Sequence, residues 1–189
     1  MTLEEYGALF SEALSRTRTA VPAGTPLGRA ADEVLEMAAA YLSDGWTFLR
    51  TGDPVNALAA FAYGLGWLDC GTSLGLLEPQ SGHPPVGVDA QIPDAMSAHL
   101  HEKTHRYRRM LNAALSAVEV GADEASPLYA GGEVLYSWAA FWYKEGVERL
   151  EAVDLPGALA RYSYGYAWLD AGIRAGLFRI TGERDLFTV

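Results

Sequence analysis

The spacing of apolar residues predicts a chain made of α-helices. Between residues 27 and 50, apolar side chains recur at intervals of three and four, which places them on one stripe of a helix. A matching helix is expected between residues 128 and 152. No segment alternates between apolar and polar residues as a half-buried strand does, so the sequence predicts an all-α fold.

Residues that favour helix ends divide this pattern into two sets of three helices. A first helix is expected over residues 3–19 and its counterpart over residues 95–120, each followed by a loop that contains Gly and Pro. The third helix of each set is expected to begin after Asp53 or Asp154. Aspartate is a favoured N-cap residue, and a proline follows within the first turn of both helices.

The two sets are copies of one unit. The Trp-Leu-Asp sequence of residues 67–69 returns at residues 168–170, an offset of 101 residues. The same offset aligns the copies without a gap from Tyr6 to Leu76 of the first copy. Roughly two dozen identities over about seventy positions indicate duplication of a whole domain instead of a short solenoid repeat.

The predicted fold is therefore two tandem three-helix bundles related by internal pseudo-symmetry. Residues 79–94 are rich in Pro and Gly and show little periodicity, which is typical of a linker. They separate a first helical repeat unit, residues 1–78, from a second unit, residues 95–189, which ends in a short tail. The tail closes with apolar residues that we expect to dock onto the bundle.

Glycines recur at equivalent positions of the third helices. A glycine inside a helix costs about 1 kcal/mol relative to alanine, so Gly64 and Gly71 predict the close approach of a neighbouring helix. Gly75 and its equivalent Gly176 are predicted to end their helices as left-handed caps.

Charge and composition exclude several classes of protein. The formal net charge of -10 and the pI near 4.8 disfavour a general nucleic-acid binder, which needs an excess of Lys and Arg. The single cysteine, Cys70, excludes an internal disulfide, and the first residues lack the pattern of a secretory signal. The longest apolar run, residues 57–68, is shorter than the roughly 20 residues that cross a bilayer. We expect a cytoplasmic protein without a membrane span.

The third helix of each copy carries the most specific motifs of the sequence. Both copies contain Trp-Leu-Asp-x-Gly followed by Gly-Leu-[LF], at residues 67–77 and 168–178. With these motifs the chain resembles the archaeal family called domain of unknown function 357. Members of that family are short bundles of three helices with no established activity. The resemblance therefore implies two members fused head to tail, and it implies no reaction.

One acidic side chain lies in each apolar third helix, at Asp69 and Asp170. A half-buried carboxylate must find hydrogen-bond donors. Arg174 lies one turn after Asp170 and suits an ion pair, but the equivalent Ser73 cannot neutralise Asp69. A shared role needs another donor, such as a helix N-terminus, a tyrosine hydroxyl or a tryptophan N–H. The structural interpretation is a hydrogen bond between helices.

The functional interpretation of the same positions is a small polar site for a ligand. Its walls would be the Tyr, Trp and Asp side chains of both third helices, namely Tyr63, Trp67, Asp69, Tyr164, Trp168 and Asp170.

Aromatic side chains are dense at residues 138–143. Trp138 and Trp142 share one helix face, whereas Phe141 and Tyr143 point elsewhere. Either the two bundles pack on each other through these rings, or the rings form a patch for a partner. Packing between the bundles is the preferred prediction, because one three-helix unit alone has a small core.

Residues 101–105 match the His-Glu-x-x-His pattern of zinc hydrolases. On a helix His101 and His105 share a face, Glu102 would be the general base, and Glu124 is a candidate third ligand. The basic residues that surround the motif indicate a solvated, locally positive face, which disfavours a dication. The first copy has no counterpart of the motif. A metal site and a zinc-dependent hydrolase are therefore remote alternatives, and no cofactor is expected.

The sequence contains no Gly-rich phosphate loop and no nucleophile elbow. It predicts an uncharacterised helical scaffold or protein-interaction module without enzymatic activity. The alternative is a small-ligand binding protein or enzyme that uses the paired Tyr, Trp and Asp positions. We expect a protein partner, and a homo-oligomer stays open. Nucleic acid is disfavoured although residues 103–109 form a basic cluster.

Overall fold

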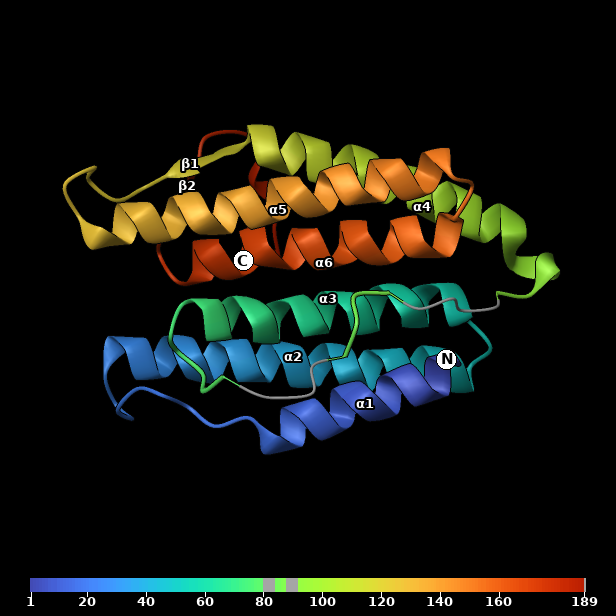
Figure 1. Ribbon diagram of the computed structural model, residues 1–189, viewed down its shortest axis with the longest axis horizontal. Coiled ribbons are helices and arrows are strands. Elements are labelled where there is room, and N and C mark those ends of the chain that lie inside the picture. The colour runs from blue at the N-terminus through green and yellow to red at the C-terminus, as the bar shows by residue number, and fades with distance from the viewer. Residues whose placement is uncertain (80–83, 88–91, 189) are drawn as a thin grey trace.

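The computed structural model describes residues 1–79, 84–87 and 92–188, so residues 80–83 and 88–91 of the predicted linker lie outside the described residues. The first repeat consists of α1 (Leu3–Arg16), α2 (Pro26–Arg50) and α3 (Pro54–Ser73) (Figure 1). The second repeat consists of η1 (Asp94–Met96), α4 (Ser97–Ser116), β1 (Val118–Val120), α5 (Pro127–Glu151), α6 (Leu155–Arg174), β2 (Phe178–Ile180) and η2 (Arg184–Leu186).

The predicted fold class is confirmed. The offset of 101 residues carries α2 onto α5 and α3 onto α6 with the same first and last positions. Figure 1 shows α3 and α6 side by side in the middle of the molecule, running in the same direction. The helices α1 and α2 lie outside α3, and α4 and α5 lie outside α6. Two tandem three-helix bundles are therefore stacked through their third helices.

Local capping chemistry sets the starts of the second and third helices. Thr25 and Ser126 cap α2 and α5, and proline follows at the first helical position, where no N–H is needed inside the helix. Asp53 and Asp154 cap α3 and α6 as predicted. Their carboxylates accept hydrogen bonds from the backbone N–H three residues later, at 2.9 and 2.8 Å.

The glycines of the third helices behave as predicted. Gly75 and Gly176 have φ angles of +69° and +76° and end α3 and α6. The residue after each of them donates its N–H to the carbonyl five residues earlier, at 2.9 Å in both repeats, which completes a Schellman motif. Inside α3, a Cβ at Gly64 would lie 2.8 Å from the ring of Phe10, so glycine allows α1 to approach.

Each repeat also contains a short antiparallel pairing that was not expected. In the second repeat β1 pairs with β2, which places Val118, Glu119 and Val120 opposite Ile180, Arg179 and Phe178. The equivalent contact in the first repeat is a single bridge between Thr19 and Leu77. The prediction of no strand is therefore wrong, because three residues are too few for alternation to be visible. The helix expected over residues 95–120 ends at Ser116, because the residues that follow form β1.

The core of the molecule is centred on α3 and α6. Fifteen of the 20 residues of α3 are buried, and the same holds for α6. A helix that is covered on nearly all sides must be apolar around its circumference, which these two sequences are. Buried residues of both repeats form one continuous hydrophobic cluster, so the two bundles share a core.

The expectation that the bundles pack through the rings of residues 138–143 is wrong. Trp138 and Phe141 remain 42% and 44% exposed on α5. The contact between bundles falls instead to α3 and α6, whose glycines and alanines let the two backbones approach closely. The aromatic side chains of α5 are therefore left partly open.

Candidate functional site

Each third helix contributes one tyrosine to the aspartate of the other repeat. The Tyr63 hydroxyl on α3 donates a hydrogen bond to Oδ2 of Asp170 on α6. The Tyr164 hydroxyl on α6 donates a hydrogen bond to Oδ2 of Asp69 on α3. Because the two tyrosines are equivalent and the two aspartates are equivalent, the contact is reciprocal, as in the interface of a symmetric dimer.

Gly66 and Ala167 mark the local symmetry axis between the repeats. They are equivalent positions, and a Cβ at Gly66 would lie 2.7 Å from the Cβ of Ala167 and 2.7 Å from the carbonyl oxygen of Tyr164. Positions on a two-fold axis are the ones that meet their own equivalents. The small residues bring α3 and α6 close enough for each tyrosine to reach the opposite aspartate.

The two tryptophans of the predicted site stand beside these tyrosines. Trp67 and Tyr63 have ring centroids 6.3 Å apart, and Trp168 and Tyr164 have centroids 6.2 Å apart. All four side chains are buried. The structure thus groups each Tyr and Trp pair with the aspartate of the other repeat, and the polar ligand site at these positions stays a prediction.

The two aspartates differ in their surroundings. Asp170 is completely buried, whereas Asp69 is partly exposed. Asp170 also accepts a hydrogen bond from the backbone N–H of Thr188 in the C-terminal tail, at 3.3 Å. Burial raises the pKa of Asp170 to about 7, although the hydrogen bonds from Tyr63 and Thr188 oppose this shift. Burial and then the charge of Asp170 raise the pKa of Tyr63 well above its usual value.

The ion pair suggested by spacing within α6 does not form. Arg174 lies 3.5 Å from a carboxylate oxygen of Glu33 on α2, on the surface of the molecule. A tyrosine hydroxyl is one of the donors expected for Asp170, but helical periodicity does not show that it comes from the other repeat. Both third helices keep a Tyr and an Asp at the same spacing, and this repetition is the sequence signal that could have indicated a contact between the repeats.

A cavity of about 310 Å³ lies beside Tyr63, between α2, α3, α4, α6 and the C-terminal tail. Of the six predicted site residues, Tyr63 is the one that lines it. The tail forms one wall and docks as expected. Phe187 is buried, and the Tyr166 hydroxyl donates a hydrogen bond to the carbonyl of Leu186.

Lys103 also lines this cavity, and its position differs from the prediction of a solvated basic face. The residue is only 6% exposed, and its ammonium group donates a hydrogen bond to Oδ1 of Asn56. The signal was its spacing, because Lys103 follows Leu100 by three residues and precedes Tyr107 by four on the packed side of α4.

The zinc motif lies on α4 with its two histidines together. The rings of His101 and His105 have centroids 4.4 Å apart. Glu102 lies 3.5 Å from Arg106, and Glu124 lines a hollow beside β1. Within the residues that the structure describes, no group of three His, Cys, Asp or Glu side chains gathers as a metal site. The motif therefore offers two histidine ligands without a third from those residues.

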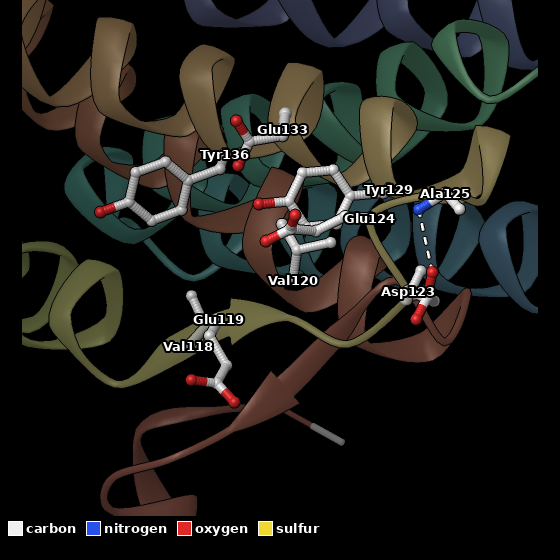
Figure 2. Close-up of a pocket in the computed structure, with 10 residues that line it drawn as sticks. Val118, Glu119, Val120, Asp123, Glu124, Ala125, Tyr129, Glu133 and Tyr136 are labelled. Atoms are coloured by element: carbon white, nitrogen blue, oxygen red, sulfur yellow. Dashed lines mark hydrogen bonds between the residues drawn. The ribbon is translucent and has the colours of Figure 1, made fainter.

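That hollow, of about 810 Å³, lies where β1 and the following loop face the start of α5 (Figure 2). We call it the acidic hollow; its polar walls are Glu119, Asp123, Glu124, Tyr129, Glu133 and Tyr136. Asp123 accepts a hydrogen bond from the N–H of Ala125 at 2.9 Å, and Glu119 pairs with Arg179. The charge of Glu133 is the main cause that raises the pKa of Tyr129. The hollow therefore has a negative potential.

Further along the same helix lies a row of exposed apolar side chains. Val134, Trp138 and Phe141 follow one another at spacings of four and three, and they are 47%, 42% and 44% exposed. We call this row the α5 stripe. The rings of Trp138 and Phe141 meet edge to face with centroids 5.7 Å apart. At the equivalent positions α2 carries Glu33, Met37 and Ala40.

The comparison with known proteins agrees with the duplicated architecture. No helix within the described ranges is long and apolar enough to cross a membrane. No curated protein and no solved structure matches the chain. One protein family, described as "Protein of unknown function (DUF357)", matches twice, over residues 5–77 and 106–178, which are related by the same offset of 101 residues. These matches cover most of the chain, which therefore belongs to the DUF357 family as a tandem pair of its domains.

Proposed function

We propose that this protein is a helical interaction module that binds a basic, amphipathic helix of a partner protein along α5. The observation that carries this proposal is the difference between the two repeats at the α5 stripe. Because the fold is built twice, positions that the fold requires to be apolar are apolar in both copies. Two of the three stripe positions are large and apolar in the second copy only, because α2 carries Glu33 and Ala40 where α5 carries Val134 and Phe141. At the third position Trp138 replaces the smaller Met37.

The buried face of α5 supplies the comparison. Ala139 and Gly146 are buried, and the equivalent positions of α2 are again alanine and glycine, both buried. At the stripe, by contrast, Phe141 replaces an alanine of α2. Trp138 rests on Trp168 with ring centroids 5.8 Å apart, and the rest of its side chain stays open. Exposed aromatic side chains that contribute little to the core are typical of interaction surfaces.

Charge indicates the kind of partner. The chain has a formal net charge of -10, and the acidic hollow lies at the N-terminal end of the same helix as the stripe. Glu133 in the hollow is the residue immediately before Val134 in the stripe. A helix with apolar residues on one side and Lys or Arg beside them matches this surface. Its cationic side chains would also meet the rings of Tyr129 and Tyr136.

The test uses a fluorescently labelled peptide of Leu and Lys that forms a basic amphipathic helix, with a Leu and Glu peptide of equal length as its counterpart. Binding is measured by fluorescence anisotropy at low and high salt. The test variant carries Val134→Glu, Trp138→Met and Phe141→Ala, which are the residues of the first repeat. We expect the parent to bind the basic peptide more weakly as salt rises, and the variant to bind it at least about tenfold more weakly. Met37→Ala, at the equivalent surface of α2, is the control and should bind like the parent.

Three results would overturn the proposal. The first is equal binding of the basic peptide by the parent and the triple variant. The second is equal binding of the acidic and basic peptides. The third is a parent protein that sediments as a dimer while the triple variant sediments as a monomer, because a second copy of the chain would then be the occupant of the stripe.

A further inference from the structure

Residue 60, beside the cavity next to Tyr63, differs between the two repeats. Ala60 lines the cavity, and its equivalent in the second repeat is Arg161. The Arg161 guanidinium donates a hydrogen bond to the carbonyl of Gly157 at 3.0 Å and lies 3.9 Å from the carboxylate of Glu145. The Arg161 side chain is only 13% exposed, so it is packed among its neighbours.

Residues beside Arg161 in the second repeat correspond to residues that line the cavity in the first repeat. A Cβ at Gly87 would lie 3.4 Å from Nη1 of Arg161, so that residue is a third neighbour beside Glu145 and Gly157. Glu145 and Gly157 lie in the aligned part of the repeats, and their equivalents, Asp44 and Asn56, both line the cavity. The second repeat therefore has an arginine at the position where the first repeat has an alanine beside a cavity.

A buried cation faces this open volume from a different helix. Lys103 of α4 donates its hydrogen bond to Asn56, and its ammonium group lies 4.7 Å from the centroid of the Tyr107 ring. Among the described residues, no carboxylate lies within 4.0 Å of the Lys103 ammonium. Arg161 has such a partner in Glu145. A buried charge without a counter-ion is costly, so an anion inside the cavity would lower the free energy of this arrangement.

The charged groups around Lys103 agree with this description. Burial is the main cause that lowers the pKa of Lys103, and the positive charge of Arg106 adds to it. The more distant carboxylates of Asp53 and Glu102 act in the opposite direction without reversing the shift. A bound anion would raise the pKa of Lys103 again.

We propose that the cavity binds a small organic carboxylate whose charged group pairs with Lys103 and whose apolar body lies between the rings of Tyr41 and Tyr107. A volume of about 310 Å³ suits a small ligand, and aromatic walls with a few convergent polar groups are typical of ligand pockets. One ammonium group matches one negative charge. Asp44 and Asp185 also line the cavity and would repel a multiply charged anion such as phosphate.

The experiment is a calorimetric titration with three probes: 3-phenylpropionate, the neutral 3-phenylpropionamide, and inorganic phosphate. We expect the parent protein to bind the carboxylate at least about tenfold more tightly than the amide, which corresponds to one charge-assisted contact. Lys103→Met keeps the length of the side chain and should remove this preference while leaving amide binding unchanged. Because Lys103→Met removes a buried charge that lacks a counter-ion, the variant should melt at the same or a higher temperature than the parent.

The matched variant is Ala60→Arg, which copies the arginine of the second repeat. Asp44 stands where Glu145 stands beside Arg161, so the new guanidinium has a carboxylate partner. This variant should retain the circular dichroism spectrum of the parent and bind neither organic probe. If it does not fold, Lys103→Met alone decides the test.

Several outcomes would overturn the inference. They are the absence of carboxylate binding, equal affinities of the parent for carboxylate and amide, unchanged carboxylate binding by folded Ala60→Arg or by Lys103→Met, and phosphate binding as tight as that of the carboxylate. None of these measurements involves the α5 stripe, so this inference and the proposed function can fail separately.

Discussion

The buried carboxyl group of Asp170 predicts how the stability of the protein changes with pH. The pKa of Asp170 is about 7 in the folded protein, against 3.8 for an aspartate in water. The folded state therefore holds the proton more tightly than the unfolded state does. The stability that this proton provides is fully present below pH 3.8, and it is lost as the pH rises through 7.

The magnitude follows from the two pKa values. Each pH unit between them changes the free energy of unfolding by about 1.4 kcal/mol. At pH 5 the ionisation of the unfolded state has cost roughly 1–2 kcal/mol of stability, and at pH 8, above both pKa values, the cost is roughly 4–5 kcal/mol. Asp170 alone should therefore make the folded protein about 3 kcal/mol less stable at pH 8 than at pH 5.

The perturbation that isolates this effect is Asp170→Asn. The amide carries no charge at either pH. Its carbonyl can accept the hydrogen bond from Thr188, and its NH₂ group can donate to the hydroxyl of Tyr63. Urea denaturation followed by tryptophan fluorescence gives the free energy of unfolding of parent and variant at pH 5 and pH 8. We expect the variant to gain about 3 kcal/mol relative to the parent between these two conditions.

Subtracting the free energy of unfolding of the parent from that of the variant at each pH cancels the contributions of the other titrating groups. Asp69→Asn is the matched control, because it exchanges a carboxylate for an amide beside a tyrosine hydroxyl at the equivalent, partly exposed position. Equal losses of stability by Asp170→Asn and the parent between pH 5 and pH 8 would show that Asp170 does not cause the pH dependence. The same would follow if the control removed the pH dependence as effectively as Asp170→Asn does.

Three further predictions concern stability and are checked by urea or thermal denaturation. Val153 has a φ of +63° and is 81% exposed where the first repeat has Gly52, so Val153→Gly should stabilise the protein by about 1 kcal/mol, whereas a destabilised variant would show that this backbone is unstrained. Tyr63→Phe leaves a buried carboxyl group without its donor and should cost about 1–3 kcal/mol, more than Tyr164→Phe, whose carboxylate partner is partly open to water; equal losses would contradict this. Gly66→Leu places a side chain where α3 and α6 touch and should cost at least about 2 kcal/mol, so a neutral effect would disprove the close contact.

Much of the fold is visible in the sequence because its determinants are local. Asp53 accepts its capping hydrogen bond from a backbone N–H three residues away, and Gly75 needs only its own φ angle to end a helix. Both depend on neighbours in the chain, and both recur in the second copy. Because the unit is duplicated, each position can be compared with its equivalent, and the offset of 101 residues predicts the tandem bundles. The family resemblance rests on the motifs of the third helices, and the family matches both copies at the same offset.

The candidate sites are less visible because they depend on contacts between distant segments. Periodicity shows that Asp170 shares a face with its neighbours along α6, but not that Tyr63 of another helix meets that face. Lys103 belongs to a cluster of basic residues, and such a cluster normally lies in water. Its burial results from the packing of α4 near α3, where Asn56 accepts its hydrogen bond. Ala60 lines the cavity, and its small side chain becomes informative only by comparison with its equivalent, Arg161.

The reciprocal exchange of Tyr and Asp has a consequence for how this protein can change in evolution. Two identical chains associated through such a contact would carry every substitution twice, once on each side. In a fused chain each side mutates alone, so one side can keep Arg161 as a filled, stable face while the other keeps Ala60 and an open space. The covalent link therefore permits a division of labour between halves that still hold each other together through the same pair of hydrogen bonds.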